Sequence, residues 1–187
     1  MIYIVTAAHN RRETTKKFAK CISEQTYHKK KLILVDDGST DGTAEEVHRI
    51  LSDAVILKGN GNLWWGGALD LAVKWLLRNA QDTDFVMFSN DDVEYGSEYV
   101  ETGVSILERK EKVLLSGLGY GKESGELIDA PIQWDYKIAE GKKQKSAPWE
   151  GNCTSTRSLF FRIADLKQLV DFIQFCCLIM RQIMSGQ

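Results

Sequence analysis

The chain has 187 residues, and its 24 lysine and arginine residues nearly balance its 26 aspartate and glutamate residues, for a formal net charge of −2. This balance argues against a general nucleic-acid binder, whose affinity depends on many cationic side chains that neutralise phosphates. Four cysteines without a C-x-x-C pair are too sparse for a disulfide scaffold and favour a reduced, cytoplasmic compartment. The length suits one structural domain with a continuous core.

The apolar segments of the chain favour neither secretion nor a membrane span. No basic segment precedes the short N-terminal apolar run, so we do not expect a signal peptide. No stretch reaches the roughly 18–20 apolar residues that a span requires. The most apolar stretch, residues 169–180, contains Asp171 and Gln174 and is followed by Arg181, so we expect a buried or interfacial helix there.

Strand and helix patterns alternate through the first 118 residues. Short apolar, β-branched runs predict strands, whereas apolar side chains recurring every three or four positions predict helices. The predicted strands are residues 2–8, 32–35, 54–57, 85–88 and 113–118. The predicted helices are residues 12–25, 42–51 (with Ser39 or Thr40 as the cap), 68–80 and 97–109. This alternation is typical of an α/β fold with a mostly parallel, Rossmann-like sheet and helices on both faces.

The pattern changes after residue 120. Residues 121–145 are rich in glycine, lysine and glutamate, and we expect a hairpin or irregular β excursion there. We therefore divide a single structural domain into an α/β half, residues 1–118, and a remaining region, residues 119–187, that ends in the apolar helix. Lysine runs at residues 29–31 and 142–145 are interpreted as solvated surface, with contact to an anionic membrane as the second interpretation.

Polar clusters follow four of the predicted strands. They comprise residues 6–10, 36–39, 59–67 and 90–92. In parallel α/β sheets, ligands bind outside the carboxyl ends of the strands. We therefore expect the four clusters to form one site.

The acidic pair after the fourth strand suits a divalent cation. Asn90, Asp91 and Asp92 carry oxygen ligands of the kind that Mg²⁺ and Mn²⁺ prefer. In an extended segment, Asn90 and Asp92 would point one way and Asp91 the other. An ordinary turn after a strand is the alternative interpretation.

Asp36 and Asp37, after the second strand, have two interpretations. They form a turn that caps the following helix, or one carboxylate accepts hydrogen bonds from a ligand with an N–H group, such as a pyrimidine base. Neither interpretation is favoured by the residues alone.

The glycine-rich loop, residues 59–67, is neither a dinucleotide fingerprint nor a phosphate-binding loop. Trp64 stands where the third glycine of the fingerprint would be, and no Gly-Lys-Ser/Thr follows. The loop leads into a helix N-terminus predicted at residues 66–68, where an anion or sugar hydroxyls would bind. Trp64 and Trp65 are either core anchors or an aromatic wall for a sugar ring or a base.

Four motifs together resemble family 2 glycosyltransferases of the GT-A fold, and most closely their rhamnosyltransferase-like branch. They are VTAAHNR at residues 5–11, VDDGSTDGT at 35–43, NGNLWWGG at 60–67 and SNDDV at 89–93. The resemblance covers residues 1–118. It implies transfer of a sugar from a nucleoside-diphosphate sugar, UDP- or dTDP-linked, to a hydroxyl of a glycan or lipid-linked acceptor, with inversion.

The resemblance also implies roles for matching positions. Asp92 would hold Mn²⁺ or Mg²⁺, which would bridge the two phosphates of the donor. The donor nucleotide would be bound by Thr6, Ala7, His9, Asn10, Asp37, Asn60, Gly67, Asn90 and Asp91. The resemblance further implies a role in cell-surface polysaccharide biosynthesis, in the cytoplasm or at the inner face of the membrane. Peripheral membrane contact and a homodimer are compatible with it.

The catalytic base is where the sequence departs from the family. The resemblance fades after Cys153, and no acidic segment followed by arginine is found, which leaves Glu150 and Asp165 as candidates. We therefore expect a chain truncated or altered at its C-terminus, and the alternative function is a nucleotide-sugar-binding remnant without turnover. A signalling receiver domain is a third interpretation, disfavoured because residues 115–118 contain no lysine.

Overall fold

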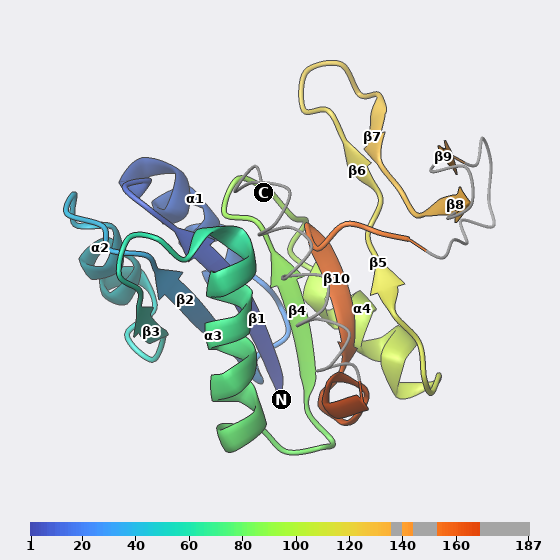
Figure 1. Ribbon diagram of the computed structural model, residues 1–187, viewed down its shortest axis with the longest axis horizontal. Helices are drawn as coiled ribbons and strands as arrows, with labels where there is room; N and C mark the ends of the chain where they lie inside the picture. The colour runs from blue at the N-terminus through green and yellow to red at the C-terminus, as the bar shows by residue number, and fades with distance from the viewer. Residues whose placement is uncertain (136–139, 144–152, 169–187) are drawn as a thin grey trace, which may run out of the picture.

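A computed structural model describes residues 1–135, 140–143 and 153–168 of the protein. Its centre is a six-stranded sheet with the strand order β3-β2-β1-β4-β10-β5 (Figure 1). The strands are β1 (Ile2–Ala8), β2 (Lys30–Asp36), β3 (Val55–Lys58), β4 (Phe85–Ser89), β5 (Leu115–Ser116) and β10 (Ser158–Arg162). The first four strands are parallel, whereas β10 runs antiparallel to both of its neighbours.

Helices cover both faces of this sheet. The helices α1 (Arg12–Ser23), α2 (Thr43–Ile50) and α4 (Tyr99–Glu108) pack into one hydrophobic cluster, and α3 (Trp64–Asn79) packs into another with the helical residues 163–168. In the view of Figure 1, α3 lies in front of the sheet and α4 behind it. The predicted α/β architecture is confirmed.

The alternation of side chains along β1 explains the two clusters. Successive residues of a strand point to opposite faces. Ile2 and Ile4 are fully buried on the side of α1, α2 and α4, while Val5 is fully buried on the side of α3. A strand buried on both faces therefore has the continuous apolar run by which it was predicted.

The strand β10 was not predicted. Its apolar residues Leu159 and Phe161 pack on the side of α3, and Phe160 packs on the side of α4. At Gly103 of α4, a Cβ atom would lie only 2.6 Å from the ring of Phe160, so this glycine lets the helix approach the strand. The apolar run of β10 is short and follows the β excursion. In the sequence it is not distinguishable from the beginning of the apolar stretch that includes residues 169–180.

The predicted helix boundaries differ from those observed by a few residues. The first helix ends at Ser23, and the fourth begins at Tyr99. The expectation that Ser39 or Thr40 caps the second helix is wrong, because Asp41 Oδ1 instead accepts a hydrogen bond from the Thr43 amide at 3.0 Å. The N-cap residue is Gly42, and the Asp41 carboxylate just before it is favoured there because it bears a full negative charge at the positive end of the helix.

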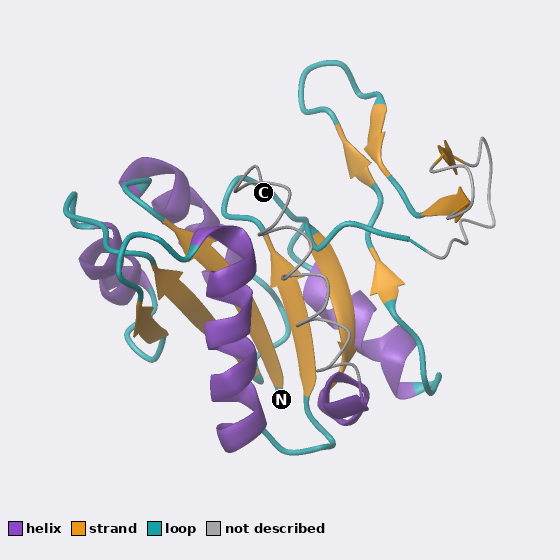
Figure 2. Cartoon of the chain, in the orientation of Figure 1, coloured by secondary structure: helices purple, strands orange, loops and turns teal. Residues whose placement is uncertain are grey.

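The predicted β excursion is confirmed for the described residues. Strands β6 (Gly119–Tyr120) and β7 (Leu127–Asp129) form one antiparallel pair, and β8 (Ile132–Asp135) and β9 (Glu140–Lys143) form another. Both pairs lie outside the main sheet (Figure 2). The helix predicted at residues 169–180 lies outside the described residues, and none of the described helices is long and apolar enough to cross a membrane.

Candidate functional site

Hydrogen bonds join the four polar clusters at the carboxyl edge of the parallel strands. The loop after β1 contacts the loop after β2, since His9 Nδ1 lies 2.5 Å from the Asp37 carbonyl oxygen. It also contacts the loop after β4, through Arg11 and Asp91. The loop after β3 is bonded to Asp37. The structure thus brings the predicted clusters together.

Asp37 holds the glycine-rich loop by three backbone hydrogen bonds. Its buried carboxylate accepts the amides of Gly61 and Leu63 at 2.8 Å each and that of Trp64 at 3.2 Å. Asp37 therefore caps α3, a helix that follows the next strand along the chain, and not the helix that follows its own loop. Negative charge is favourable at this position because the first amides of a helix have no partners within the helix.

The start of α3 differs from the prediction. The helix begins at Trp64, four residues before the predicted start at Ala68. The helix N-terminus predicted at residues 66–68 is therefore wrong, since the Gly67 amide is already bonded within the helix, to the Leu63 carbonyl oxygen at 3.0 Å. The Asp37 carboxylate lies at the true N-terminus.

Two glycines permit the close approach of these loops. A Cβ atom on Gly59 would lie 2.4 Å from Asp37 Oδ1 and 2.9 Å from Asp37 Cα. Gly38 has a φ of +74°, and a Cβ atom there would lie 3.0 Å from the amide nitrogen of Gly61. Only a residue without a side chain fits at either position.

The two tryptophans have different environments. The Trp65 indole donates a hydrogen bond to the Thr156 hydroxyl at 2.9 Å, and its ring packs against the cluster of α3, so it is a core anchor. The Trp64 side chain is 70% exposed, and its φ is +54°. Such a φ costs a bulky residue about 1–3 kcal/mol, and the bond from its amide to Asp37 opposes this cost.

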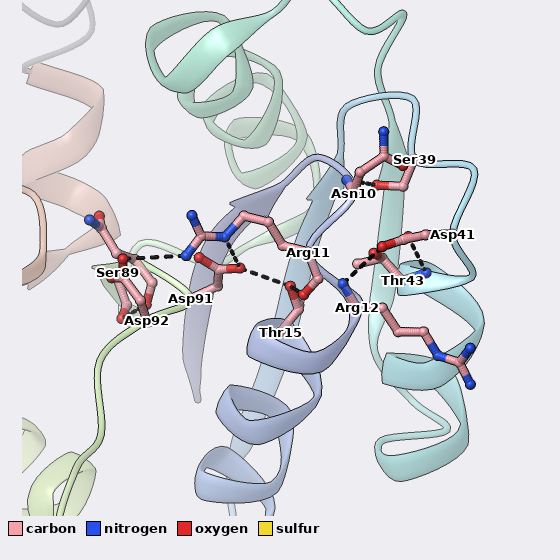
Figure 3. Close-up of polar contacts among 11 residues, drawn as sticks. Asn10, Arg11, Arg12, Thr15, Ser39, Asp41, Thr43, Ser89, Asp91 and Asp92 are labelled. Carbon is pink, nitrogen blue, oxygen red and sulfur yellow. Dashed lines mark hydrogen bonds and ion pairs between the residues drawn. The ribbon is translucent and has the colours of Figure 1, made fainter.

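Asn10 connects the β1 and β2 loops. Its backbone amide donates to Ser39 Oγ at 3.0 Å (Figure 3), and its side-chain Oδ1 accepts from the Thr40 backbone amide at 2.9 Å. Its φ of +52° lies in the left-handed region, which asparagine tolerates better than most residues. Its side-chain amide also lies 3.1 Å from His9 Nε2. These contacts fix the shape of the loop.

The guanidinium of Arg11 contacts both carboxylates that follow β4, those of Asp91 and Asp92. Arg11 Nε donates to Asp91 Oδ2 at 3.0 Å, and Arg11 Nη2 lies 3.4 Å from Asp92 Oδ2 (Figure 3). Asp91 is buried and also accepts the Thr15 hydroxyl at 2.8 Å, whereas the Asp92 side chain is 52% exposed. Burial raises the pKa of Asp91, against the opposing effect of the bonds from Thr15 and Arg11. The acidic pair stands in a turn and not in an extended segment.

The other predicted donor-binding residues lie at the same edge with less distinctive contacts. Thr6 is fully buried, and its hydroxyl has no hydrogen-bond partner among the described residues. Ala7 is half-buried in β1 beside it. Asn60 is exposed and its Oδ1 accepts the Asn62 amide at 3.0 Å. Asn90 is half-buried, and its carbonyl oxygen accepts the hydroxyl of the preceding serine.

Of the two candidate bases, Asp165 is not part of this arrangement. Asp165 follows β10 in the helical residues 163–168, where the Ile163 amide bonds to the carbonyl oxygen of Asp84, just before β4 begins. It therefore lies at the opposite edge of the sheet from the acidic pair. Glu150 lies outside the described residues.

Arg11 and Thr15 were missed by the sequence analysis. Both contact Asp91 only because β1 and β4 are neighbours in the sheet, although β2 and β3 come between them in the chain. The strand order is not visible in the sequence. The sole signal was a basic residue directly after a polar strand end, at the start of a predicted helix.

The sequence matches the model of a family described as "Glycosyl transferase family 2" over residues 3–183. This match continues past residue 118, which bounds the clearest part of the resemblance, and past Cys153, after which the resemblance fades. An N-acetylglucosaminyl-diphospho-decaprenol L-rhamnosyltransferase of Mycobacterium tuberculosis is 24% identical over 178 residues, which cover 91% of this chain and 58% of that protein. The chain thus spans less than two thirds of this relative's length.

Two solved structures share the fold. A mannosyltransferase of Pyrobaculum calidifontis, in complex with GDP-Man and Mn²⁺, matches with a TM-score of 0.64 at 16% identity, over 90% of this chain and 46% of that one. Staphylococcus aureus TarS 1-349, in complex with UDP, matches with a TM-score of 0.63 at 14% identity, over 89% and 48%. These likenesses confirm the GT-A fold that the motifs implied.

Proposed function

Because the chain belongs to glycosyl transferase family 2, we propose that it binds a nucleoside-diphosphate sugar and transfers the sugar to an acceptor hydroxyl. The observation that carries this proposal is the joining of four polar loops at the carboxyl edge of the parallel strands, where such sheets bind ligands. Residues 1–118 would bind the donor, and residues 119–187 would contribute to the acceptor side.

The nucleotide would lie over the loops that Asp37 connects. We propose UDP or dTDP as the nucleotide. The carboxylate of Asp37 fixes the loop after β3 by three backbone bonds, so it shapes the wall of the nucleotide pocket. The other residues proposed to bind the donor are Thr6, Ala7, His9, Asn10, Asn60, Gly67, Asn90 and Asp91.

The acidic turn, which contains Asp91 and Asp92, fits a divalent cation. Mn²⁺ and Mg²⁺ are commonly held by one or two protein carboxylates together with substrate phosphates. The Asp92 carboxylate is half exposed and suits this donor set, although the described residues contain no group of three acidic, histidine or cysteine side chains that would hold a metal ion alone. When bound, the cation would neutralise charge on the leaving diphosphate. The Mn²⁺ in the mannosyltransferase complex supports this proposal.

The transfer requires a base for the acceptor hydroxyl. In the proposed step the hydroxyl oxygen attacks the anomeric carbon, the bond to the diphosphate breaks, and a carboxylate takes the hydroxyl proton, with inversion of configuration. Asp165 lies at the opposite edge of the sheet and is not retained as this base. Glu150 stays a candidate. Donor binding without turnover is the second candidate function, favoured by the position of Asp165.

The acceptor is proposed to be a glycan or a lipid-linked sugar. The protein is proposed to act in the cytoplasm or at the inner face of the membrane. The name of the mycobacterial relative, which includes a diphospho-decaprenol acceptor, supports a lipid-linked acceptor. Peripheral membrane contact and a homodimer belong to the same proposal.

Calorimetric titration tests the donor site. UDP, dTDP, GDP and their sugars are titrated with and without Mn²⁺. We expect one nucleotide to bind, Asp92→Ala to remove only the increase caused by Mn²⁺, and Asp37→Ala to weaken binding under both conditions. Asp53→Ala, which removes an exposed carboxylate elsewhere, is the control. Absence of binding by every nucleotide contradicts the proposal, and release of nucleoside diphosphate from the bound sugar distinguishes turnover from binding alone.

A further inference from the structure

Arg11 joins the loop after β1 to the two carboxylates of the acidic turn, Asp91 and Asp92. It directly precedes α1, and its side chain is 44% exposed. Its Nε atom bonds to the buried Asp91 at 3.0 Å, and its Nη2 atom makes a longer contact of 3.4 Å with the exposed Asp92. The guanidinium is thus anchored at one end and open to solvent at the other.

The neighbouring Arg12 shows that this orientation is specific. Its guanidinium points away from the acidic turn (Figure 3), and Nη2 lies 3.5 Å from Glu46 of α2. The two arginines are adjacent in sequence and similarly exposed, at 44% and 48%. Of these two arginines, Arg11 is the one that pairs with the acidic turn.

We propose that Arg11 supplies the positive charge of the acidic turn before the donor binds, and that its Nη2 end turns to the donor diphosphate when the donor arrives. This inference rests on the proposed function. Two adjacent carboxylates repel each other, and the guanidinium between them offsets this repulsion. A divalent cation at Asp92 would stand close to this guanidinium, and like charges at such distances repel appreciably even near a protein surface. The cation therefore binds poorly to the protein alone.

The diphosphate changes this balance. A phosphate accepts two parallel hydrogen bonds from the planar fork of a guanidinium, whereas Asp92 makes one long contact with it. When Nη2 turns to the phosphate, Asp91 keeps both its bond to Nε and its bond to the Thr15 hydroxyl. Asp92 is then free to hold the cation. Donor and cation thus bind cooperatively, and each raises the affinity for the other by the same factor.

The test compares Arg11→Gln with Arg12→Gln and uses binding, not turnover. Mn²⁺ alone is titrated by electron paramagnetic resonance, and UDP, dTDP and GDP are each titrated in EDTA. We expect Arg11→Gln to bind Mn²⁺ alone about tenfold more tightly than the parent, and to bind the nucleotide in EDTA about tenfold more weakly. Arg12→Gln should match the parent in both titrations.

A second variant separates charge from geometry. Arg11→Lys keeps the positive charge but not the fork, so Mn²⁺ alone should bind as weakly as it does to the parent, while the nucleotide binds more weakly. The proposal is overturned if Mn²⁺ binds no more tightly to Arg11→Gln than to the parent, or if the nucleotide binds both equally in EDTA. Absence of nucleotide binding by the parent contradicts the proposed function instead. Thermal melting of all three variants confirms that they are folded.

Discussion

The two acidic loops at the edge of the sheet are held in opposite ways. Asp37 is buried and its carboxylate is bonded to three backbone amides of another loop. Asp92 is half exposed, and within the described part of the chain its carboxylate pairs with one side chain, that of Arg11, at 3.4 Å. Backbone donors cannot move without moving the loop itself, whereas a long side chain changes partners by rotating about its bonds. The Asp37 side of the site is therefore preassembled, and the Asp92 side is adjustable.

This difference suits the two parts of the proposed nucleoside-diphosphate donor. A base and ribose have a fixed shape, and a rigid pocket binds them with less loss of conformational entropy. A diphosphate arrives with a counter-cation, so its side of the site must exchange one positive charge for another. The comparison predicts that substitutions on the rigid side cost stability, while those on the adjustable side mainly alter binding.

The largest effect is expected for Asp37→Ala. Three backbone amides lose a charged acceptor, and each such bond contributes more than a neutral one. We expect the free energy of unfolding to fall by about 3 kcal/mol, measured by urea denaturation. Asp53→Ala should change it by less than about 0.5 kcal/mol, as is usual at exposed sites. Equal effects of the two substitutions would show that the loop is not held by Asp37.

The next largest loss of stability is expected for Gly59→Ala. The new Cβ atom would lie 2.4 Å from Asp37 Oδ1, so the loop must shift and weaken the bonds to Asp37. We expect a loss of about 2 kcal/mol, typical of overpacking, again from urea denaturation. A Cβ atom on Gly96 would meet nothing within 4 Å beyond its chain neighbours, so Gly96→Ala serves as the control. A stability equal to that of the control would contradict the rigidity inferred for this loop.

Thr15→Val tests the anchored end of the adjustable side. The substitution removes the hydroxyl that donates to Asp91 Oδ2 at 2.8 Å and leaves a buried carboxylate with one donor fewer. We expect unfolding to become easier by about 1 kcal/mol. Thr14→Val, at the half-buried neighbouring position, should have little effect. If Thr15→Val is as stable as the parent, Asp91 is held by Arg11 alone.

The smallest expected effect on stability concerns the ion pairs between α1 and Glu46 of α2. Three cations, Arg12, Lys16 and Arg49, contact Glu46, and hydrogen bonds from Arg49 and Lys16 lower its pKa from 4.5 to about 2. A lowered pKa in the folded state stabilises the protein above pH 4.5, and this contribution is lost as the pH falls towards 2. The cations are partly solvated, so the effect is small.

Thermal melting against pH measures this effect. Between pH 4.5 and 2 the midpoint of the parent should fall more steeply than that of Glu46→Gln, which has no carboxyl group to protonate there. Glu45→Gln alters an exposed neighbour and should follow the parent curve. Parallel curves for the parent and Glu46→Gln would show that the cluster does not contribute.

The sequence predicted which residues meet at the sheet edge better than it predicted how they meet. Parallel strands place all their carboxyl ends together, so Asp37 and Asp92 could be assigned to one site from the alternation of elements alone. The contact of Arg11 with Asp91 depends on β1 and β4 being neighbours, which the alternation does not reveal. The start of α3 at Trp64 depends on a cap from a residue in a different loop. Such distant partners leave no local pattern in the sequence.

The position of β10 has a consequence for how the molecule is made. The strand β4 ends at Ser89, but the strand that covers its free edge begins only at Ser158. Until that segment leaves the ribosome, the fully buried residues Val86 and Met87 belong to an uncovered, apolar edge strand. Such edges pair readily with other chains, and non-local strand pairing is slow. The edge of β4 therefore stays unpaired while residues 90–157 are synthesised.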